Sequence, residues 1–144
     1  MTQTNGAQYL NVLSQVLKST EDTATKMNGD FQKLRNALDT GTEHDISTSE
    51  YEAIKTTFQD GTDVYEGDLN RLAGAQAPVR VLGKHKQLVA AYRDYTEACQ
   101  AMVNSLNPTE QTVDKAAFDA AEQAQDAAMQ RVNANTQRIM MTAM

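Results

Sequence analysis

The sequence predicts an all-α protein: an antiparallel, up-down-up-down four-helix bundle with long helices, built as one domain over residues 1–144. Along most of the chain, apolar residues recur at alternating steps of three and four, the period of helices packed nearly parallel to their neighbours. The two prolines both fall where one helix would give way to the next. No stretch shows the period-two alternation of a strand. Three short connections then favour the up-down-up-down order.

The first helix is predicted over residues 6–39, and Gly41 follows it as a stop signal. Asn28-Gly29 is a turn signal, but the apolar spacing passes through it without a change of phase. We therefore expect one helix of about 50 Å. The predicted inward positions are Leu10, Leu13, Leu17, Thr20, Ala24, Met27, Phe31, Leu34 and Leu38.

The second helix is predicted over residues 48–74. Ser47 and Glu50 stand at the spacing of a capping box, and the segment GAQAP ends the helix. A four-four step around Phe58, beside Gly61, is a local stutter in the apolar spacing. The predicted inward positions are Tyr51, Ile54, Phe58, Thr62, Tyr65, Leu69 and Leu72.

The third helix is predicted over residues 79–106, with Pro78 suited to its start and Asn107-Pro108 ending it. Its inward stripe is predicted to be Val81, His85, Leu88, Tyr92, Tyr95, Cys99, Met102 and Leu106.

The fourth helix is predicted over residues 109–142. Asn107 is a suitable cap, with Pro108 in the first helical position and Glu110 in the third, and Thr112 is the competing cap. Alanines on its inner face allow close approach of helix axes, and two polar residues there would fix the register. The predicted inward positions are Phe118, Ala121, Gln125, Ala128, Val132, Asn135 and Ile139.

The stripe in the third helix carries the side chains best suited to chemistry, but its geometry argues against a shared site. His85 and Cys99 are separated by about 21 Å along a helix, whereas the ligands of one zinc ion lie about 2 Å from it. The Glu-x-x-His pairs of di-iron bundles are missing. We therefore expect these side chains to pack inside the bundle, and we expect no catalytic residues, no metal ligands, no cofactor and no enzymatic activity.

The acidic segment QDGTDVYEGD contains Asp60, Asp63, Glu66 and Asp68. It lacks the ligand spacing of a calcium-binding loop. A solvated acidic helix face is the favoured interpretation.

Small residues from all four helices are expected at similar heights: Gly29, Gly61, Ala90, Ala91, Ala127 and Ala128. They indicate either close packing, which we favour, or a hollow. A hollow lined by aromatic residues would suit a small apolar ligand. The candidate pocket residues are Phe31, Phe58, Tyr65, Tyr92 and Tyr95.

The net charge of −6 argues against nucleic-acid binding, which demands a basic surface. Charge is nevertheless uneven. The end expected to hold both termini gathers Arg71, Arg80, Lys84, Lys86, Arg131 and Arg138, and the other end holds Asp39, Glu43, Asp45, Glu50, Glu52, Glu110 and Asp114. If an upstream anchor joined the N-terminus to a membrane, the basic end would face anionic lipid. Ordinary surface charge is the alternative.

The segment APVRVLGKHKQLVAAYRDYTEACQAMVNSLNP, together with the Thr-, Gln- and Asn-rich first helix, resembles helical ectodomains of Gram-positive bacterial cell-surface lipoproteins. The resemblance implies an extracytoplasmic, lipid-anchored location, with the leader and the lipid-bearing cysteine upstream of residue 1. Cys99 lies within a helix and is not that cysteine. A cytoplasmic location is the alternative.

These observations predict a non-enzymatic bundle that acts as a protein-interaction or spacer domain at the cell surface. The alternative is a sensing bundle that binds a small molecule near the small-residue layer.

Overall fold

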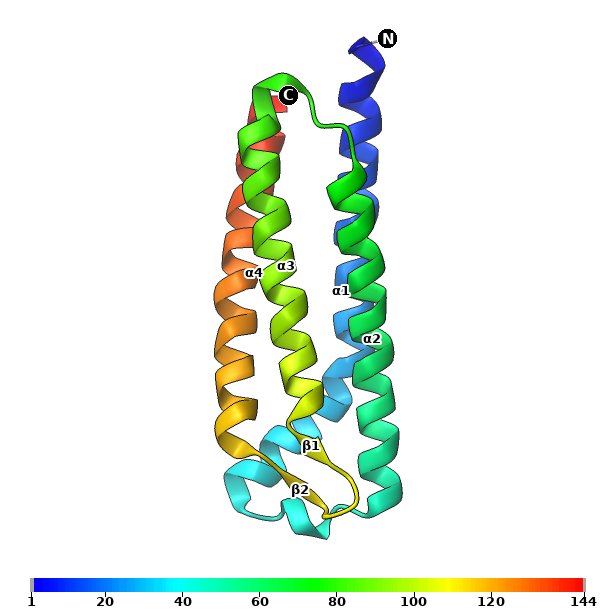
Figure 1. The fold of residues 1–144 in the computed structure, drawn as a ribbon, viewed down its shortest axis with the longest axis vertical. Coiled ribbons are helices and arrows are strands. Elements are labelled where there is room, and N and C mark those ends of the chain that lie inside the picture. The colour runs from blue at the N-terminus through cyan, green and yellow to red at the C-terminus, as the bar shows by residue number, and fades with distance from the viewer. Residues whose placement is uncertain (1, 144) are drawn as a thin grey trace.

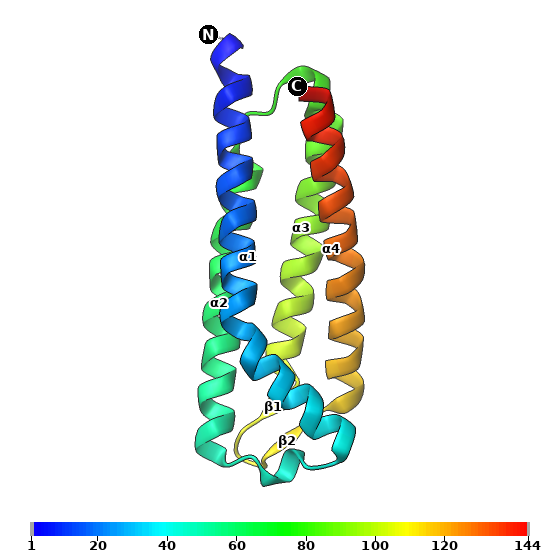
Figure 2. The same ribbon diagram turned by 180° about the vertical axis from the view of Figure 1, so that it is seen from behind.

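The computed structural model describes the backbone of residues 2–143 and the side chains of residues 6–142. Within that range it contains four long helices, so the predicted all-α class is confirmed. Figures 1 and 2 show that successive helices run in opposite directions and that both chain ends lie at one end of the molecule. The elements are α1 (Thr2–Thr40), η1 (Glu43–Asp45), α2 (Thr48–Gly74), η2 (Val79–Val81), α3 (Leu82–Asn104), β1 (Leu106–Asn107), β2 (Thr112–Val113) and α4 (Lys115–Ala143), where η denotes a short 3-10 helix.

The ends of α1 and α2 follow local capping chemistry. Gly41 takes a left-handed φ of 70°, which glycine adopts at little cost, and this ends α1. Ser47 then begins α2, because its hydroxyl oxygen accepts a hydrogen bond from the Glu50 amide at 3.1 Å. The predicted range of the second helix agrees with the structure. The first helix begins at Thr2, earlier than predicted.

The predicted start of the fourth helix at residue 109 is wrong, and neither Asn107 nor Thr112 is its cap. β1 and β2 pair antiparallel, with Leu106 opposite Val113, and the left-handed Gln111 (φ 55°) lies in the connecting turn. Asp114 caps α4 instead, since its Oδ1 accepts from the Ala117 amide at 3.1 Å. The hairpin also replaces the last turn predicted for the third helix, which ends at Asn104.

Two apolar clusters form the core. The upper cluster, near the chain ends, comprises Tyr9, Leu13, Val16, Tyr65, Leu69, Leu72, Val81, Leu88, Ala91, Tyr92, Tyr95, Cys99, Ala128, Val132 and Ile139. The lower cluster, near the hairpin, comprises Leu34, Ala37, Leu38, Ile46, Tyr51, Ile54, Phe58, Met102, Val103, Leu106, Phe118 and Ala121. Met27 is half-buried and packs against both clusters, so it marks their junction.

The predicted inward positions of α2 and α3 are all buried, and those of α4 are buried except for the half-buried Gln125. The prediction for the upper part of α1 is confirmed at Leu13 and Thr20, which are buried, and wrong at three other positions. Tyr9, Val16 and Thr23 are buried in place of Leu10, Leu17 and Ala24, of which the two leucines are half-buried and the alanine is exposed. This face is selected because its polar atoms find buried partners, as the hydrogen bond from Tyr9 to His85 illustrates.

α1 is continuous but bends in its second half, so that its last turns cross toward α4 (Figure 2). Above the bend it contacts α3, for example through Thr20 and Tyr92. Below the bend it contacts α4, where the rings of Phe31 and Phe118 stack with centroids 5.8 Å apart. Asn28-Gly29 lies between these two sets of contacts, and glycine lowers the resistance of a helix to bending.

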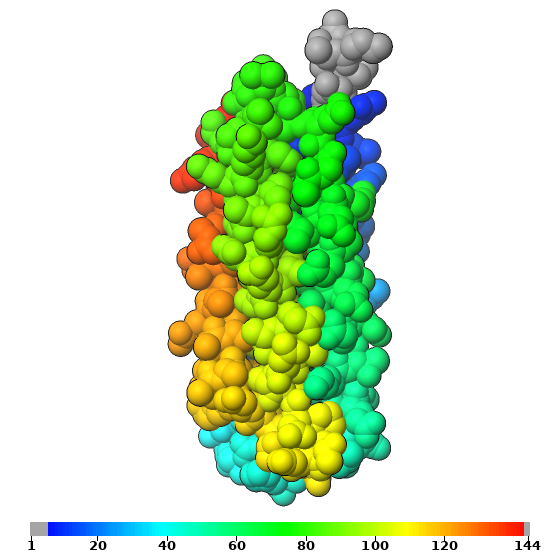
Figure 3. Space-filling model, viewed as in Figure 1, coloured from blue at the N-terminus to red at the C-terminus, as the bar shows by residue number. Residues whose placement is uncertain are grey.

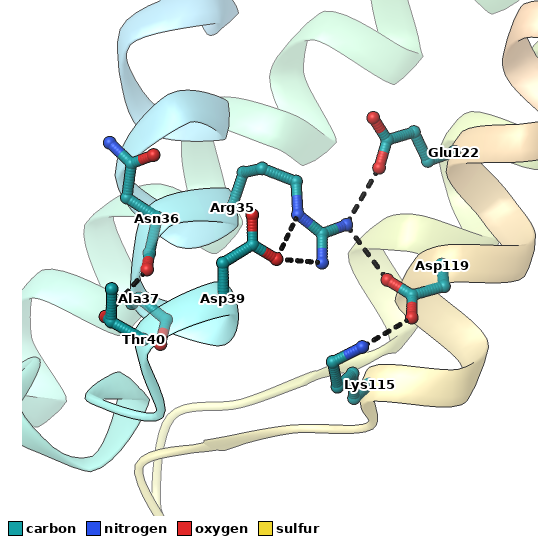
Figure 4. A network of polar contacts seen from close by, with 8 residues as sticks. All are labelled: Arg35, Asn36, Ala37, Asp39, Thr40, Lys115, Asp119 and Glu122. Carbon is teal, nitrogen blue, oxygen red and sulfur yellow. Dashed lines mark hydrogen bonds and ion pairs between the residues drawn. The ribbon is translucent and has the colours of Figure 1, made fainter.

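Arg35 fastens the lower part of α1 to α4 (Figure 4). Its Nη1 donates to Asp119 at 2.9 Å and to Glu122 at 2.8 Å. Its guanidinium also lies 5.3 Å from the ring centroid of Phe118. Polar and aromatic contacts therefore join the two helices at this level, although α1 touches α4 less extensively than it touches α2.

Candidate functional site

A cavity of about 120 Å³ lies at the junction of the two core clusters. All four helices contribute to its wall. Met27, which packs against both clusters, is part of that wall. The lining residues are Ala24, Met27, Asn28, Phe31, Phe58, Thr62, Tyr65, Tyr95, Cys99 and Gln125. The close packing favoured from the sequence is found at Gly61, which lies against Met27, and is interrupted by the cavity on the other side of Met27.

Four of the five candidate pocket residues line this cavity: Phe31, Phe58, Tyr65 and Tyr95. Tyr92 does not. The Tyr92 hydroxyl shares a 2.7 Å hydrogen bond with the Thr20 hydroxyl, which also donates to the Val16 carbonyl at 2.7 Å. This bond holds Tyr92 toward α1, in the upper cluster.

The small-residue layer is only partly inside the bundle. Gly61 is buried, and a Cβ there would overlap the Met27 sulfur, so this glycine lets Met27 reach the cavity wall. Gly29 is exposed and has open space around its Cα. Ala90 and Ala127 are exposed as well and line a surface groove between α3 and α4. The sequence therefore predicted the level of the cavity but overestimated how many small residues face inward.

The cavity wall combines aromatic faces with a few polar groups. Tyr65 and Tyr95 meet edge to face, with ring centroids 5.1 Å apart and hydroxyl oxygens 3.4 Å apart. The Gln125 amide has only distant acceptors, the Ala98 carbonyl at 3.5 Å and the Met102 sulfur at 3.6 Å. These hydroxyl and amide groups are therefore available for a polar atom of a guest molecule.

The wall carries no charge at neutral pH. No Lys, Arg, Asp or Glu is among the lining residues. Burial raises the pKa of Tyr65 to about 12 and that of the Cys99 thiol to about 12, and it also raises the pKa of Tyr95. Cys99 therefore stays a neutral, unreactive thiol. A cavity of this character favours an uncharged guest.

The acidic segment of α2 departs from the predicted solvated face at one position. Asp60, Asp63 and Glu66 are exposed, as expected, but Asp68 is buried with 4% of its surface exposed. Its Oδ2 has no hydrogen-bond partner within the described residues, and Arg71 Nη1 lies 3.9 Å from its Oδ1. Burial accordingly raises the pKa of Asp68.

His85 joins α3 to the beginning of α1. Its Nδ1 shares a 2.9 Å hydrogen bond with the Tyr9 hydroxyl, and the two rings meet edge to face at 5.2 Å. Burial lowers the pKa of His85. The sequence predicted the inward position of His85 but not its partner, because the apolar spacing pointed to Leu10 rather than Tyr9.

We expect the protein to lose stability as the pH falls below about 6.5, the pKa of histidine in an unfolded chain. The unfolded state takes up a proton there before the buried His85 does, so acid favours unfolding until the pH passes the lowered folded-state pKa. Urea unfolding at about pH 7.5 and about pH 5.5 measures the change. His85→Gln should reduce it, whereas His44→Gln, at an exposed position, should leave it intact.

The comparison with His85→Gln is needed because the raised pKa of Asp68 acts with the opposite sign, adding stability as the pH falls. If His85→Gln and the unsubstituted protein show the same pH dependence, His85 makes no contribution to it.

The structure places the predicted basic residues toward the end that holds both chain ends. Arg80 lies in η2, Lys84 and Lys86 in the first turns of α3, and Arg138 near the end of α4. The other two are tied to neighbouring side chains: Arg131 pairs with Asp94 at 3.2 Å, and Arg71 donates to Gln15 and lies near Asp68.

No group of three or more His, Cys, Asp or Glu side chains gathers in metal-binding geometry among residues that the structure describes. Nor does any described helix combine the length and hydropathy needed to cross a membrane. Comparisons with protein-family models, with curated proteins and with solved structures return no match to this chain.

Proposed function

We propose that the bundle binds a small, uncharged, single-ring molecule in the cavity between its two core clusters. The observation that carries the proposal is the wall itself, which places the four aromatic residues Phe31, Phe58, Tyr65 and Tyr95 around one space. Apolar cavities of about 150 Å³ in protein cores hold benzene. A volume of 120 Å³ supports a ligand near that size and argues against the larger molecules that fill pockets of about 300 Å³ or more.

The polar groups of the wall narrow the ligand class further. A purely apolar guest would leave the Tyr65 and Tyr95 hydroxyls and the Gln125 amide without strong partners, whereas a ring with one hydroxyl group supplies one. An ionised guest would lose its hydration without meeting an opposite charge. Phenol and its simple derivatives therefore match the cavity best.

Access runs between α1 and α4. Ala24 and Asn28 are both exposed and yet line the cavity, and the half-buried Gln125 lies on α4. Above the bend, α1 lies farther from α4 than it does below the bend, so these residues lie at the opening of the cavity, which we term the mouth. A larger side chain at position 24 would close the mouth without entering either core cluster.

We expect phenol at millimolar concentration to raise the melting temperature, because a ligand that binds only the folded state stabilises it. Benzoate should have a smaller effect, since its carboxylate would be desolvated without a cation. Calorimetric titration with phenol gives the affinity, and the melting temperature gives the linked stabilisation.

Ala24→Leu should abolish the phenol effect while leaving the ligand-free melting temperature nearly unchanged, because leucine is a good helix former at this exposed position. Ala53→Leu is the matched control, an equal change at an exposed site on α2 outside the cavity. The proposal fails if phenol does not stabilise the protein, or if both leucine variants bind phenol as the unsubstituted protein does.

An interaction or spacer role, a protein partner, an extracytoplasmic location and a lipid anchor stay predictions from the sequence. Ligand binding is compatible with each, since the cavity opens only between α1 and α4 and leaves the other outer helix faces available.

A further inference from the structure

One end of the bundle has a charge opposite to that of the whole protein. The stretches 6–17, 69–89 and 127–142 meet at one end of the bundle (Figure 3). They contain six Lys and Arg residues and no Asp or Glu, although the chain has a net charge of −6; two of the six, Arg71 and Arg131, face Asp68 and Asp94 just outside these stretches. The opposite end, around η1 and the hairpin, holds the acidic residues predicted for it. The molecule is therefore strongly polarised along its long axis.

Exposed apolar side chains gather at the same end. Among the described residues, the large hydrophobic residues classed as exposed are Val64, Val79, Leu82 and Met141, and the last three lie here. Val79 is 90% exposed and Met141 is 80% exposed. η2, which carries Val79, packs against α4, which carries Met141. These apolar residues and the nearby cations form what we term the tip surface: Val79, Arg80, Leu82, Lys84, Lys86, Met141 and Arg138.

Local structure explains why the apolar residues point outward. Val81 is fully buried in the upper cluster, and its neighbours Val79 and Leu82 are thereby turned to the outside of the same tight turn. The core needs only Val81 from this turn. The two exposed side chains therefore add nothing to the upper cluster and leave apolar area in water at a cost to stability.

Three of the cations beside them are available for an external partner. Lys84, Lys86 and Arg138 form no ion pair with any described residue. Lys86 follows Leu82 by four positions on α3, so the two side chains lie on one outer face. A partner that suits this surface must be anionic and must also accept apolar side chains between its charges.

We propose that the tip surface docks end-on against an anionic phospholipid membrane. The cations contact lipid phosphates, and Val79 and Leu82 enter the headgroup region, where apolar side chains leave water. The acidic end is repelled by the same membrane, which sets the orientation of the long axis. A nucleic acid would use the cations but would offer little to Val79, Leu82 and Met141. This inference does not depend on ligand binding in the cavity.

Co-sedimentation with phosphatidylcholine vesicles, with and without phosphatidylglycerol, tests the proposal. We expect binding to the phosphatidylglycerol vesicles at low salt, little binding to pure phosphatidylcholine, and weaker binding as salt rises. Each cation near an anionic surface strengthens binding about fivefold, so Lys84→Gln with Lys86→Gln should weaken it about 25-fold. The matched control, Lys26→Gln with Arg93→Gln, makes the same charge change at exposed positions away from the tip that form no ion pair with a described residue.

A second variant tests the apolar contribution. Val79→Ser with Leu82→Ser should weaken vesicle binding while leaving the far-ultraviolet circular dichroism and melting temperature unchanged, because both side chains are exposed. Absence of binding to phosphatidylglycerol vesicles at low salt overturns the proposal, and so does an equal loss in the control variant. Binding to DNA that is as strong as vesicle binding and insensitive to the serine substitutions would identify a general polyanion site instead.

Discussion

Phe118→Ala is expected to lower the free energy of unfolding by about 3 to 5 kcal/mol. Phe118 is fully buried one turn into α4, stacks on Phe31 and lies beneath the Arg35 guanidinium. Its removal leaves a void in the lower cluster and takes away the apolar contact that accompanies the Arg35 ion pairs. Urea unfolding followed by circular dichroism measures the loss.

Phe118→Leu is the control, because it keeps an apolar side chain in the lower cluster and should cost less than half as much. Hydrogen exchange should show the first turns of α4 losing protection in the alanine variant before the rest of the bundle does. A loss below about 1 kcal/mol for Phe118→Ala would mean that this contact does not hold α4 against α1.

Tyr9→Ala should cost a similar amount, about 3 to 5 kcal/mol. Tyr9 is 2% exposed in the upper cluster, and its hydroxyl is the partner of His85. Losing both the ring and the hydrogen bond should free the first turns of α1. Thermal unfolding gives the overall loss, and hydrogen exchange along α1 locates it.

Two further substitutions separate the contributions. Tyr9→Phe keeps the ring and should cost only about 1 kcal/mol, the net value of one hydrogen bond. Leu10→Ala changes the neighbouring residue, which is half-buried at the edge of the cluster and should be less sensitive. A greater loss for Leu10→Ala than for Tyr9→Ala would show that α1 faces the core through the leucine, as its apolar spacing suggested.

This comparison also shows where apolar spacing is sufficient to predict a helix face and where it is not. In α2 and α3 one set of positions at three-four spacing is clearly more apolar than its neighbours, and that set is buried. In the upper part of α1 two sets, beginning at Tyr9 and Leu10, have the same spacing and share Leu13 and Thr20. Hydrophobicity alone favours Leu10 and Leu17, but the buried partner His85 on α3 selects Tyr9.

The connection between α3 and α4 was beyond local sequence rules for a different reason. Asn107 does accept a hydrogen bond from the Glu110 amide, at 3.2 Å, as a helix cap would. The segment forms a hairpin and not a helix start, because Leu106 and the half-buried Val113 pack on the lower cluster. In addition, Gln111 donates to the Ile46 carbonyl at 2.7 Å. These partners lie far away in the chain, so a tertiary contact decides between two locally acceptable turns.

The sequence could predict which residues line the candidate cavity, but it could not predict that a cavity is present. Equal heights along antiparallel helices brought Phe31, Phe58, Tyr65 and Tyr95 into one prediction, and all four line it. Whether a space remains between such residues depends on the course of α1 past Met27, which no residue pattern specifies. Tyr92 was included wrongly because its helical position is right but its hydroxyl is held by Thr20.

Because α1 bends beside the cavity, a small change in the angle of the bend moves the beginning of the helix by a larger distance. The part of α1 from Thr2 to Met27 is about 40 Å long at 1.5 Å per residue. A change of about 5° in the bend angle displaces the beginning of the helix by roughly 3 Å. The guest that we propose for the cavity would lie beside Met27 and Phe31 and so contact the helix on both sides of its bend. Small adjustments there would be magnified at the extremity where the polypeptide begins.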